Sequence, residues 1–196
     1  AEATELIQSI MEKRGIKLHL GTSVKAVYKR DGKKVLTLTK GEKTSSISAH
    51  EILVATGMAA NTDLDLEKAG VSFDKHGIIA DDFLQTSQSH IYAAGDVVGP
   101  IKLTAMGHYQ AGVSVQNMFS GKRAKVDYEV VPRCLFTDPE LASVGVTEET
   151  LKEHKIAYKK GMALLAQVAR ANSDNISEGF VKVLTKTDGT IIGASI

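Results

Sequence analysis

The chain has 196 residues, of which 43% are hydrophobic and 24% charged, and its 24 basic and 23 acidic side chains nearly cancel. That length suits one or two domains with a sizeable core, and the balance of charge excludes a strongly electrostatic nucleic-acid or membrane-surface binder. No apolar run approaches the roughly 20 residues that a membrane span needs. The single cysteine, Cys134, excludes an internal disulfide framework, a CxxC zinc site and a redox dithiol within this sequence.

The first residues lack the basic segment and apolar run of a signal peptide. We therefore expect a cytoplasmic protein, or one in an organelle matrix if a targeting segment has been removed. Because the sequence starts within an expected helix and stops within an expected strand, we also expect it to be part of a longer polypeptide.

Apolar residues at helical spacing predict a helix over residues 3–14, which Gly15 ends, followed by a short strand over 16–20. Glycine-containing turns then separate three short segments that predict an antiparallel meander, near 24–29, 34–39 and 44–49. Residues 51–57 are apolar and end in glycine, which is the pattern of a buried parallel strand.

Residues 61–70 predict one short helical turn, and residues 71–80 a hairpin. The apolar segment 90–96 predicts a second buried strand, with Asp96 at its carboxyl end. A helix is expected from Thr104, as its cap, to about residue 119.

From residue 126 the pattern changes to short strands and one short helix. Strands are expected at 130–136, 162–168, 179–185 and 190–196, with the helix at 147–154. The basic segment 120–126 is interpreted as a solvated linker. The predicted fold class is therefore α/β, followed by an α+β region with an antiparallel sheet.

The end of the second buried strand is the strongest candidate for a binding site. Ligands of open α/β sheets bind at the carboxyl ends of strands, where the Asp96 carboxylate can accept hydrogen bonds from the hydroxyls of a sugar or ribityl chain. Gly95 leaves room for such a chain to approach the backbone. The helix start at Thr104, Ala105 and Met106 offers free amides and a positive dipole end, suited to an anion or to a ring that gains negative charge.

Six segments in one order carry a resemblance to a known family. They are ILVATG at 52–57, NT at 61–62, LEKAGV at 66–71, LQTS at 84–87, IYAAGD at 91–96 and FTDPELASVG at 136–145. The series closely resembles the flavin-dependent pyridine nucleotide–disulfide oxidoreductases and covers essentially the whole chain.

The resemblance implies part of a flavoprotein fold with two dinucleotide-binding domains, followed by a dimerisation domain. On that basis residues 1–60 are the C-terminal part of the NAD-binding domain, residues 61–125 the second half of the FAD-binding domain, and residues 126–196 the first part of the interface domain. The implied cofactors are FAD and NAD, and the implied assembly is a homodimer, with a multienzyme complex as a further option.

The same resemblance implies roles for individual residues. Asp96, preceded by Gly95, would accept hydrogen bonds from the FAD ribityl chain. The helix start at residues 104–106 would face the pyrimidine edge of the flavin. Thr56 and Gly57 would lie close to the crossing between the FAD and NAD domains.

The sequence also departs from the family pattern. Met58, Ala59 and Ala60 replace the usual arginine and proline before Asn61, which removes a charged side chain from that loop. No GxGxxG, no CxxxxC pair and no His-Pro element occurs, and in the family's order all three fall outside this segment. We therefore expect that the chain alone cannot carry out disulfide chemistry, and we assign no catalytic residue or metal ligand to it.

The resemblance implies an enzyme that moves electrons between NAD(H), flavin and a small dithiol or disulfide substrate. The alternative is a redox-inactive dimerisation or interaction module with the same fold, because a missing dithiol suits both. Cys134 is interpreted as a small buried hydrophobic residue and His108 as a structural residue on a helix face.

Overall fold

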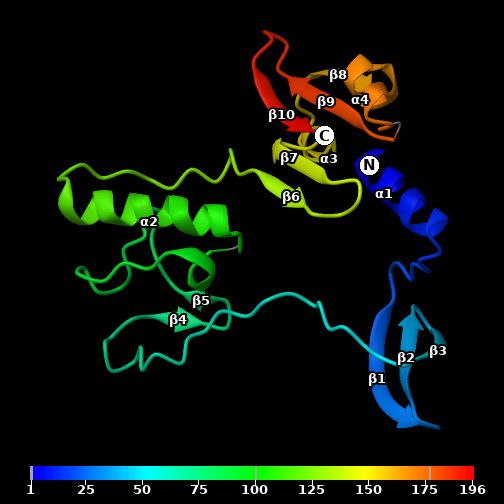
Figure 1. Ribbon diagram of the computed structural model, residues 1–196. Helices are drawn as coiled ribbons and strands as arrows, with labels where there is room; N and C mark the ends of the chain where they lie inside the picture. Colours follow the sequence, from blue (N-terminus) through cyan, green and yellow to red (C-terminus); the bar gives the residue numbers. More distant parts are fainter. Residues whose placement is uncertain (1, 100, 177) are drawn as a thin grey trace. The chain divides into compact units, whose positions relative to one another are not determined.

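The computed structural model describes residues 2–99, 101–176 and 178–196, which form two compact units, Glu2–Gly57 and Met58–Ile196 (Figure 1). Within these residues no helix is both long enough and apolar enough to cross a bilayer.

The first unit contains a helix and an antiparallel sheet, as predicted. Its elements are α1 (Glu2–Lys13), β1 (Ser23–Arg30), β2 (Lys33–Lys40) and β3 (Lys43–Ala49), with the sheet order β1-β2-β3. Gly15 ends the helix with a φ of 83°, a left-handed conformation that glycine adopts without strain. Asp31 and Gly32, both with positive φ, form the two-residue turn between β1 and β2.

Two strands predicted in this unit are absent. Residues 16–20 and 51–57 have no regular secondary structure, and Leu53 and Val54 are 93% and 74% exposed. Parallel strands exist only when neighbouring strands satisfy their backbone groups, and within the described residues no strand pairs with either segment. The prediction of a short strand at 16–20 and of a buried strand at 51–57 was therefore wrong.

The first part of Met58–Ile196 is mostly turns around a small core. Its elements are β4 (Phe73–Asp74), β5 (Gly77–Ile78), the 3₁₀ turn η1 (Gly95–Val97) and α2 (Thr104–Phe119). Leu66, Val71, Ile78 and Ala93 form the buried cluster. Residues 63–70 form consecutive turns rather than a helix, and the predicted hairpin is confirmed as β4–β5.

The predicted buried strand at 90–96 is also not part of a sheet. The Ala93 N–H donates to the Leu84 carbonyl at 3.1 Å, and Tyr92 forms an isolated bridge with Gln85. The segment therefore pairs briefly with the chain just before it and then turns into η1.

Helix α2 spans the predicted residues, but Thr104 is not its cap. Thr104 is already helical, and the capping position is Leu103, which has an extended backbone and provides no side-chain hydrogen bond. The prediction of the helix is confirmed and that of its cap is wrong.

The last part of the chain forms the predicted antiparallel sheet, with one strand at 141–145 that was not predicted and another that spans 159–164 instead of 162–168. Its five strands lie in the order β6 (Arg133–Leu135), β7 (Leu141–Gly145), β10 (Ile191–Ser195), β9 (Phe180–Thr185) and β8 (Lys159–Leu164). The connections contain α3 (Glu148–Glu153), η2 (Leu165–Gln167) and α4 (Ala169–Ser173). Gly145 has a φ of 75°, and a Cβ there would lie 2.2 Å from the Ile192 carbonyl oxygen, so this turn requires glycine. The side chain of Thr147 caps α3 by accepting the Thr150 N–H.

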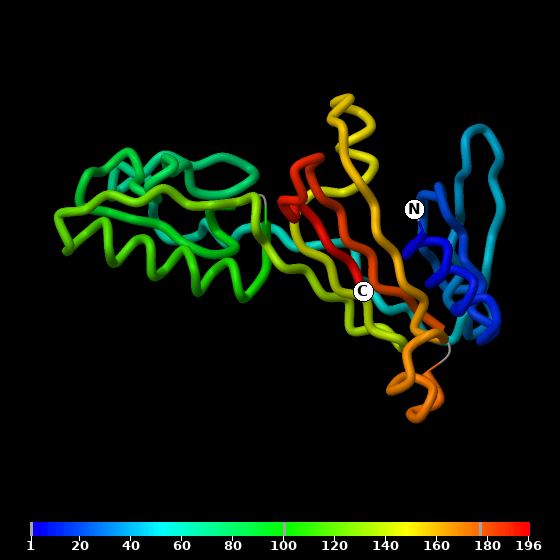
Figure 2. The backbone as a smooth tube through the Cα atoms, turned by 90° about the horizontal axis from the view of Figure 1, so that it is seen from above, coloured from blue at the N-terminus to red at the C-terminus, as the bar shows by residue number. Residues whose placement is uncertain are grey.

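The connection between α2 and the sheet is fastened rather than free. It runs back along α2 (Figure 2), and Arg123 and Lys125 pair with Asp81 and Asp82 at 3.3 and 2.8 Å. The basic side chains are exposed, as predicted for a solvated linker, but these ion pairs also place the segment beside residues 81 and 82. Cys134 was misjudged: it lies in the three-residue strand β6 and is exposed.

Candidate functional site

Two glycines bring the predicted cofactor-binding residues together where η1 meets α2. Gly95 has a φ of 82°, and a Cβ built on Gly107 would lie 3.4 Å from the Gly95 Cα. This close backbone approach places the turn that carries Asp96 against the first turns of α2. We call the segment 95–110 the η1–α2 junction.

Asp96 presents an available carboxylate at this junction. The residue is exposed, and its backbone carbonyl accepts a hydrogen bond from the Lys102 Nζ at 3.0 Å. No donor among the described residues bonds to its carboxylate oxygens. Both oxygens can therefore accept hydrogen bonds from the hydroxyls of a ligand.

The start of α2 provides donors at the same junction. The first helical bond described runs from the Gly107 N–H to the Leu103 carbonyl, so the N–H groups of residues 104–106 have no acceptor within the helix. Thr104 and Ala105 are exposed, whereas the Met106 side chain is 3% exposed and anchors the helix start in the core. The free amides and the positive end of the helix dipole suit a group with negative charge.

Sequence reasoning missed Gln110, which links the parts of the junction. Its side chain is completely buried; its Oε1 accepts the Gly95 N–H at 2.7 Å, and its Nε2 donates to the Tyr128 hydroxyl at 3.1 Å. The signal that could have revealed it is a long polar side chain on the apolar stripe that Met106 and Val113 define at helical spacing.

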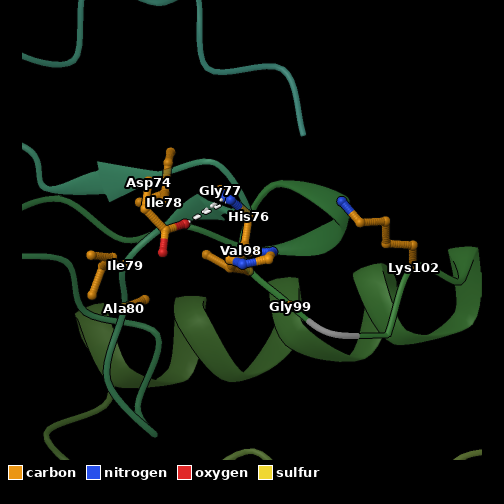
Figure 3. A pocket seen from close by; sticks show the side chains of 9 residues that line it. All are labelled: Asp74, His76, Gly77, Ile78, Ile79, Ala80, Val98, Gly99 and Lys102. Atoms are coloured by element: carbon orange, nitrogen blue, oxygen red, sulfur yellow. Dashed lines mark hydrogen bonds between the residues drawn. The ribbon is translucent and has the colours of Figure 1, made fainter. Parts of the chain in front are cut away.

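A cavity of about 430 Å³ is lined by Val98, Gly99 and Lys102 of the junction together with residues 74 and 76–80 (Figure 3). Asp74 accepts hydrogen bonds from the backbone N–H groups of His76 and Gly77. Lys102 lies at the opposite end of the set of lining residues. In the part of the chain that the structure describes, none of the predicted cofactor-binding residues lines this cavity. The cavity therefore lies at the junction but is not formed by the predicted site residues.

Thr56 and Gly57 are not part of the junction as described. Both are exposed and belong to the first unit, in a stretch without regular secondary structure, and Gly57 has a φ of 105°. The structure thus assembles five of the predicted residues, which are Gly95, Asp96, Thr104, Ala105 and Met106.

Comparison with known protein families identifies the fold. Residues 1–112 match the family model described as pyridine nucleotide-disulphide oxidoreductase, and residues 131–196 match that family's dimerisation domain. The chain belongs to the pyridine nucleotide-disulphide oxidoreductase family. The family resemblance and the fold class predicted from the sequence are both confirmed.

Curated relatives of the chain include dihydrolipoyl dehydrogenases and a mercuric reductase. Dihydrolipoyl dehydrogenases of Staphylococcus aureus and Bacillus subtilis are 37% and 34% identical to it over its whole length, which covers 42% of each relative. A mercuric reductase of Bacillus cereus is 36% identical over 93% of the chain and 29% of that protein. From the FTDPELASVG segment and residues 169–173 and 178–182, the sequence predicts dihydrolipoyl dehydrogenase as the first choice and mercuric reductase as the second.

Solved structures share the fold. LpdA of Mycobacterium tuberculosis superposes with a TM-score of 0.87 at 24% identity, over the whole chain and 42% of that protein. The HOCl-induced flavoprotein disulfide reductase RclA of Escherichia coli gives 0.86 at 22%, over 98% of the chain and 44% of that protein.

The junction fits the flavin cofactor that the family implies. The Asp96 carboxylate is exposed and available to hydroxyl donors, the amides at the start of α2 are free of helical acceptors, and the contact between Gly95 and Gly107 leaves no side chain between them. A ribityl chain needs acceptors for its hydroxyls, and a flavin that gains electrons needs donors at its pyrimidine edge. Asp96 supplies the acceptors for the hydroxyls, and the start of α2 supplies the donors.

Proposed function

We propose that this chain is part of a flavoprotein oxidoreductase of the dihydrolipoyl dehydrogenase type. The enzyme moves electrons between NAD(H), FAD and a small dithiol or disulfide, with lipoamide as the first choice of substrate. The observation that carries the proposal is the identity of 37% to a dihydrolipoyl dehydrogenase along the whole chain, combined with the available Asp96 carboxylate beside the start of α2.

Each part of the junction has a role in holding the cofactor. Asp96 accepts hydrogen bonds from ribityl hydroxyls, and these bonds are charge-assisted and therefore stronger than neutral ones. The amides of residues 104–106 and the helix dipole stabilise negative charge at the pyrimidine edge of the ring. When bound, FAD relays two electrons between the nicotinamide and the dithiol.

Thr56 and Gly57 are proposed to lie where the NAD and FAD domains cross. The backbone conformation of Gly57, with its φ of 105°, suits a sharp change of chain direction between two domains. The domain limits at residues 60 and 125 belong to the same proposal.

We infer that the enzyme acts as a homodimer, and its assembly into a multienzyme complex is a further proposal. Residues 131–196 match a dimerisation domain, which supports the first of these. We propose the cytoplasm as its compartment, with an organelle matrix as the alternative, since one relative is a mitochondrial dihydrolipoyl dehydrogenase of Arabidopsis thaliana.

Mercuric reductase is the second candidate function, supported by the relative that is 36% identical. A redox-inactive dimerisation module is the third, since the chain contains one cysteine and therefore no dithiol of its own.

One assay on the full-length protein separates the three. NADH-dependent reduction of lipoamide and NADPH-dependent reduction of Hg²⁺ are measured on the same flavin-containing preparation. The proposal expects lipoamide to be the faster substrate. Faster turnover of Hg²⁺ assigns the second function, and no turnover of either substrate by flavin-loaded protein assigns the third.

A further inference from the structure

Gln110 is a completely buried polar side chain, and both ends of its amide are used. Its neighbours on the buried face of α2 include Met106 and Val113, which are 3% and 7% exposed. A buried amide without partners is strongly destabilising, so its two hydrogen bonds fix where it lies.

The partners also fix the orientation of the amide. The Gly95 N–H can only donate, so the oxygen of Gln110 must face it, at 2.7 Å. Nε2 therefore points to the Tyr128 hydroxyl, which accepts its hydrogen bond at 3.1 Å. The packing around Nε2 is close, because a Cβ added to Gly99 would lie 3.5 Å from it.

Two side chains thereby hold the Asp96 residue from both sides. Gln110 binds the N–H of Gly95, immediately before Asp96, and Lys102 binds the carbonyl of Asp96 itself at 3.0 Å. Since Gly95 is the residue with positive φ in this turn, its amide sets the direction in which the turn leaves the preceding segment.

We propose that Gln110 is a positioning residue that aims the Asp96 carboxylate at the flavin, and that Tyr128 holds Gln110 in place. The proposal rests on the assignment of the junction as a flavin site. Gln110 itself touches no cofactor in this account; it acts through the backbone of Gly95.

Through Tyr128, Gln110 is also linked to the segment that precedes the dimerisation domain. Tyr128 lies in the connection that runs back along α2, just before the first residue matched by the dimerisation domain at 131. Tyr109 also holds this segment, since its hydroxyl accepts the Asp127 N–H at 3.1 Å. The Gln110 amide therefore joins the turn that carries Asp96 to the entrance of the dimerisation domain.

The test uses the full-length protein with Gln110→Met, Tyr128→Phe and Asp96→Ala, singly and combined. Methionine keeps the length of the side chain while removing both hydrogen bonds. Gln116→Met is the matched control, because Gln116 lies exposed on the same helix. The measurements are the dissociation constant of FAD and the hydrogen–deuterium exchange of the peptide containing Gly95 in the flavin-free protein.

We expect Gln110→Met to weaken FAD binding by roughly 3- to 10-fold, which corresponds to the loss of a neutral hydrogen bond, and to speed exchange at Gly95 by a similar factor. Tyr128→Phe should produce a smaller change in the same direction and no additional change in the Gln110→Met background. In the Asp96→Ala background, Gln110→Met should weaken FAD binding by less than twofold, since the carboxylate it positions is gone.

Three results would overturn the proposal. One is a Gln110→Met protein that binds FAD like the Gln116→Met control. Another is a Gln110→Met effect that is undiminished in the Asp96→Ala background, which indicates a general loss of structure. If Gln110→Met does not fold, unchanged FAD affinity and Gly95 exchange in Tyr128→Phe overturn it instead. If the parent protein binds no FAD, the proposed function is refuted together with the role of Gln110. If the parent binds FAD and only the variants give the results above, the role of Gln110 alone is refuted.

Discussion

Glu148 is a buried carboxylate that ties α3 to the sheet through several partners. Its side chain is 6% exposed and accepts hydrogen bonds from the Tyr158 hydroxyl at 2.8 Å and from Lys160 and Lys182 at 3.3 Å. The hydrogen bond from Tyr158 is the largest influence on the pKa of Glu148; burial opposes it, but together with the two lysines it lowers the pKa below the ordinary value of 4.5. The carboxylate is therefore ionised in the folded protein at neutral pH.

A lowered pKa in the folded state makes this contribution to stability depend on pH. The stabilisation is fully present above the ordinary value of 4.5 and is lost as the pH falls through the lower pKa of the folded state. Glu148→Gln should thus reduce the free energy of unfolding at pH 7 by about 1–3 kcal/mol, and the difference from the parent should shrink in acid.

Denaturant unfolding at several pH values measures this effect, with Glu153→Gln as the control, because Glu153 lies exposed on the same helix. An equal loss of stability for Glu148→Gln at pH 7 and well below the ordinary carboxyl pKa would contradict the assignment.

At the scale of elements, Asn117 fastens the connection that follows α2. Its Nδ2 donates to the carbonyls of Phe83 and Ala124 at 2.8 and 2.9 Å, and its Oδ1 accepts the Ala124 N–H at 2.7 Å. Arg123 stacks over the Phe83 ring at 4.0 Å. These contacts hold the basic segment against the turn at residues 81–83.

Asn117→Leu should release this segment, because it removes three hydrogen bonds at once. Trypsin cleavage after Lys122, Arg123 and Lys125 should become roughly tenfold faster, corresponding to about 1.4 kcal/mol of local stability. Asp82→Asn is the control: it removes an exposed ion pair with Lys125 and should change the rate little. Equal cleavage rates in Asn117→Leu and the parent would show that Asn117 does not hold the connection.

The elements that the sequence predicted correctly are those fixed by local chemistry. Helix α1, the β1–β2–β3 meander and the short helix α3 follow from apolar spacing, a glycine stop and turn residues that lie within a few positions of one another. The strands predicted at 16–20, 51–57 and 90–96 are absent from the sheets. A strand forms only beside a partner strand, and the spacing of residues within one segment does not reveal whether a partner exists.

In the candidate site, too, short motifs predicted some residues, whereas residues that depend on distant contacts were missed. Asp96 and the start of α2 were found from short motifs, whereas Gln110 was missed because its importance depends on Gly95 and Tyr128, which are distant in sequence. Cys134 was expected to be buried in an apolar strand, but β6 lies at the edge of its sheet and all three of its residues are exposed.

At the scale of the whole molecule, the chain spans about 42% of the length of the dihydrolipoyl dehydrogenases it matches. Its two matched segments correspond to the pyridine nucleotide-disulphide oxidoreductase model and to that family's dimerisation domain. We propose that the η1–α2 junction holds the flavin of the complete enzyme through the Asp96 carboxylate.

Flavin retention by an Asp96→Ala variant of the full-length protein tests that claim most directly. Losing a charge-assisted hydrogen bond reduces the binding free energy by about 1.5–3 kcal/mol. FAD should therefore bind roughly ten- to hundredfold more weakly. His108→Ala, an exposed residue on the same helix, is the control and should keep its flavin. Bound-flavin absorbance is compared on dilution, with far-UV circular dichroism to show that the fold is intact. The account predicts flavin loss from Asp96→Ala alone, and retention as tight as in the parent would contradict it.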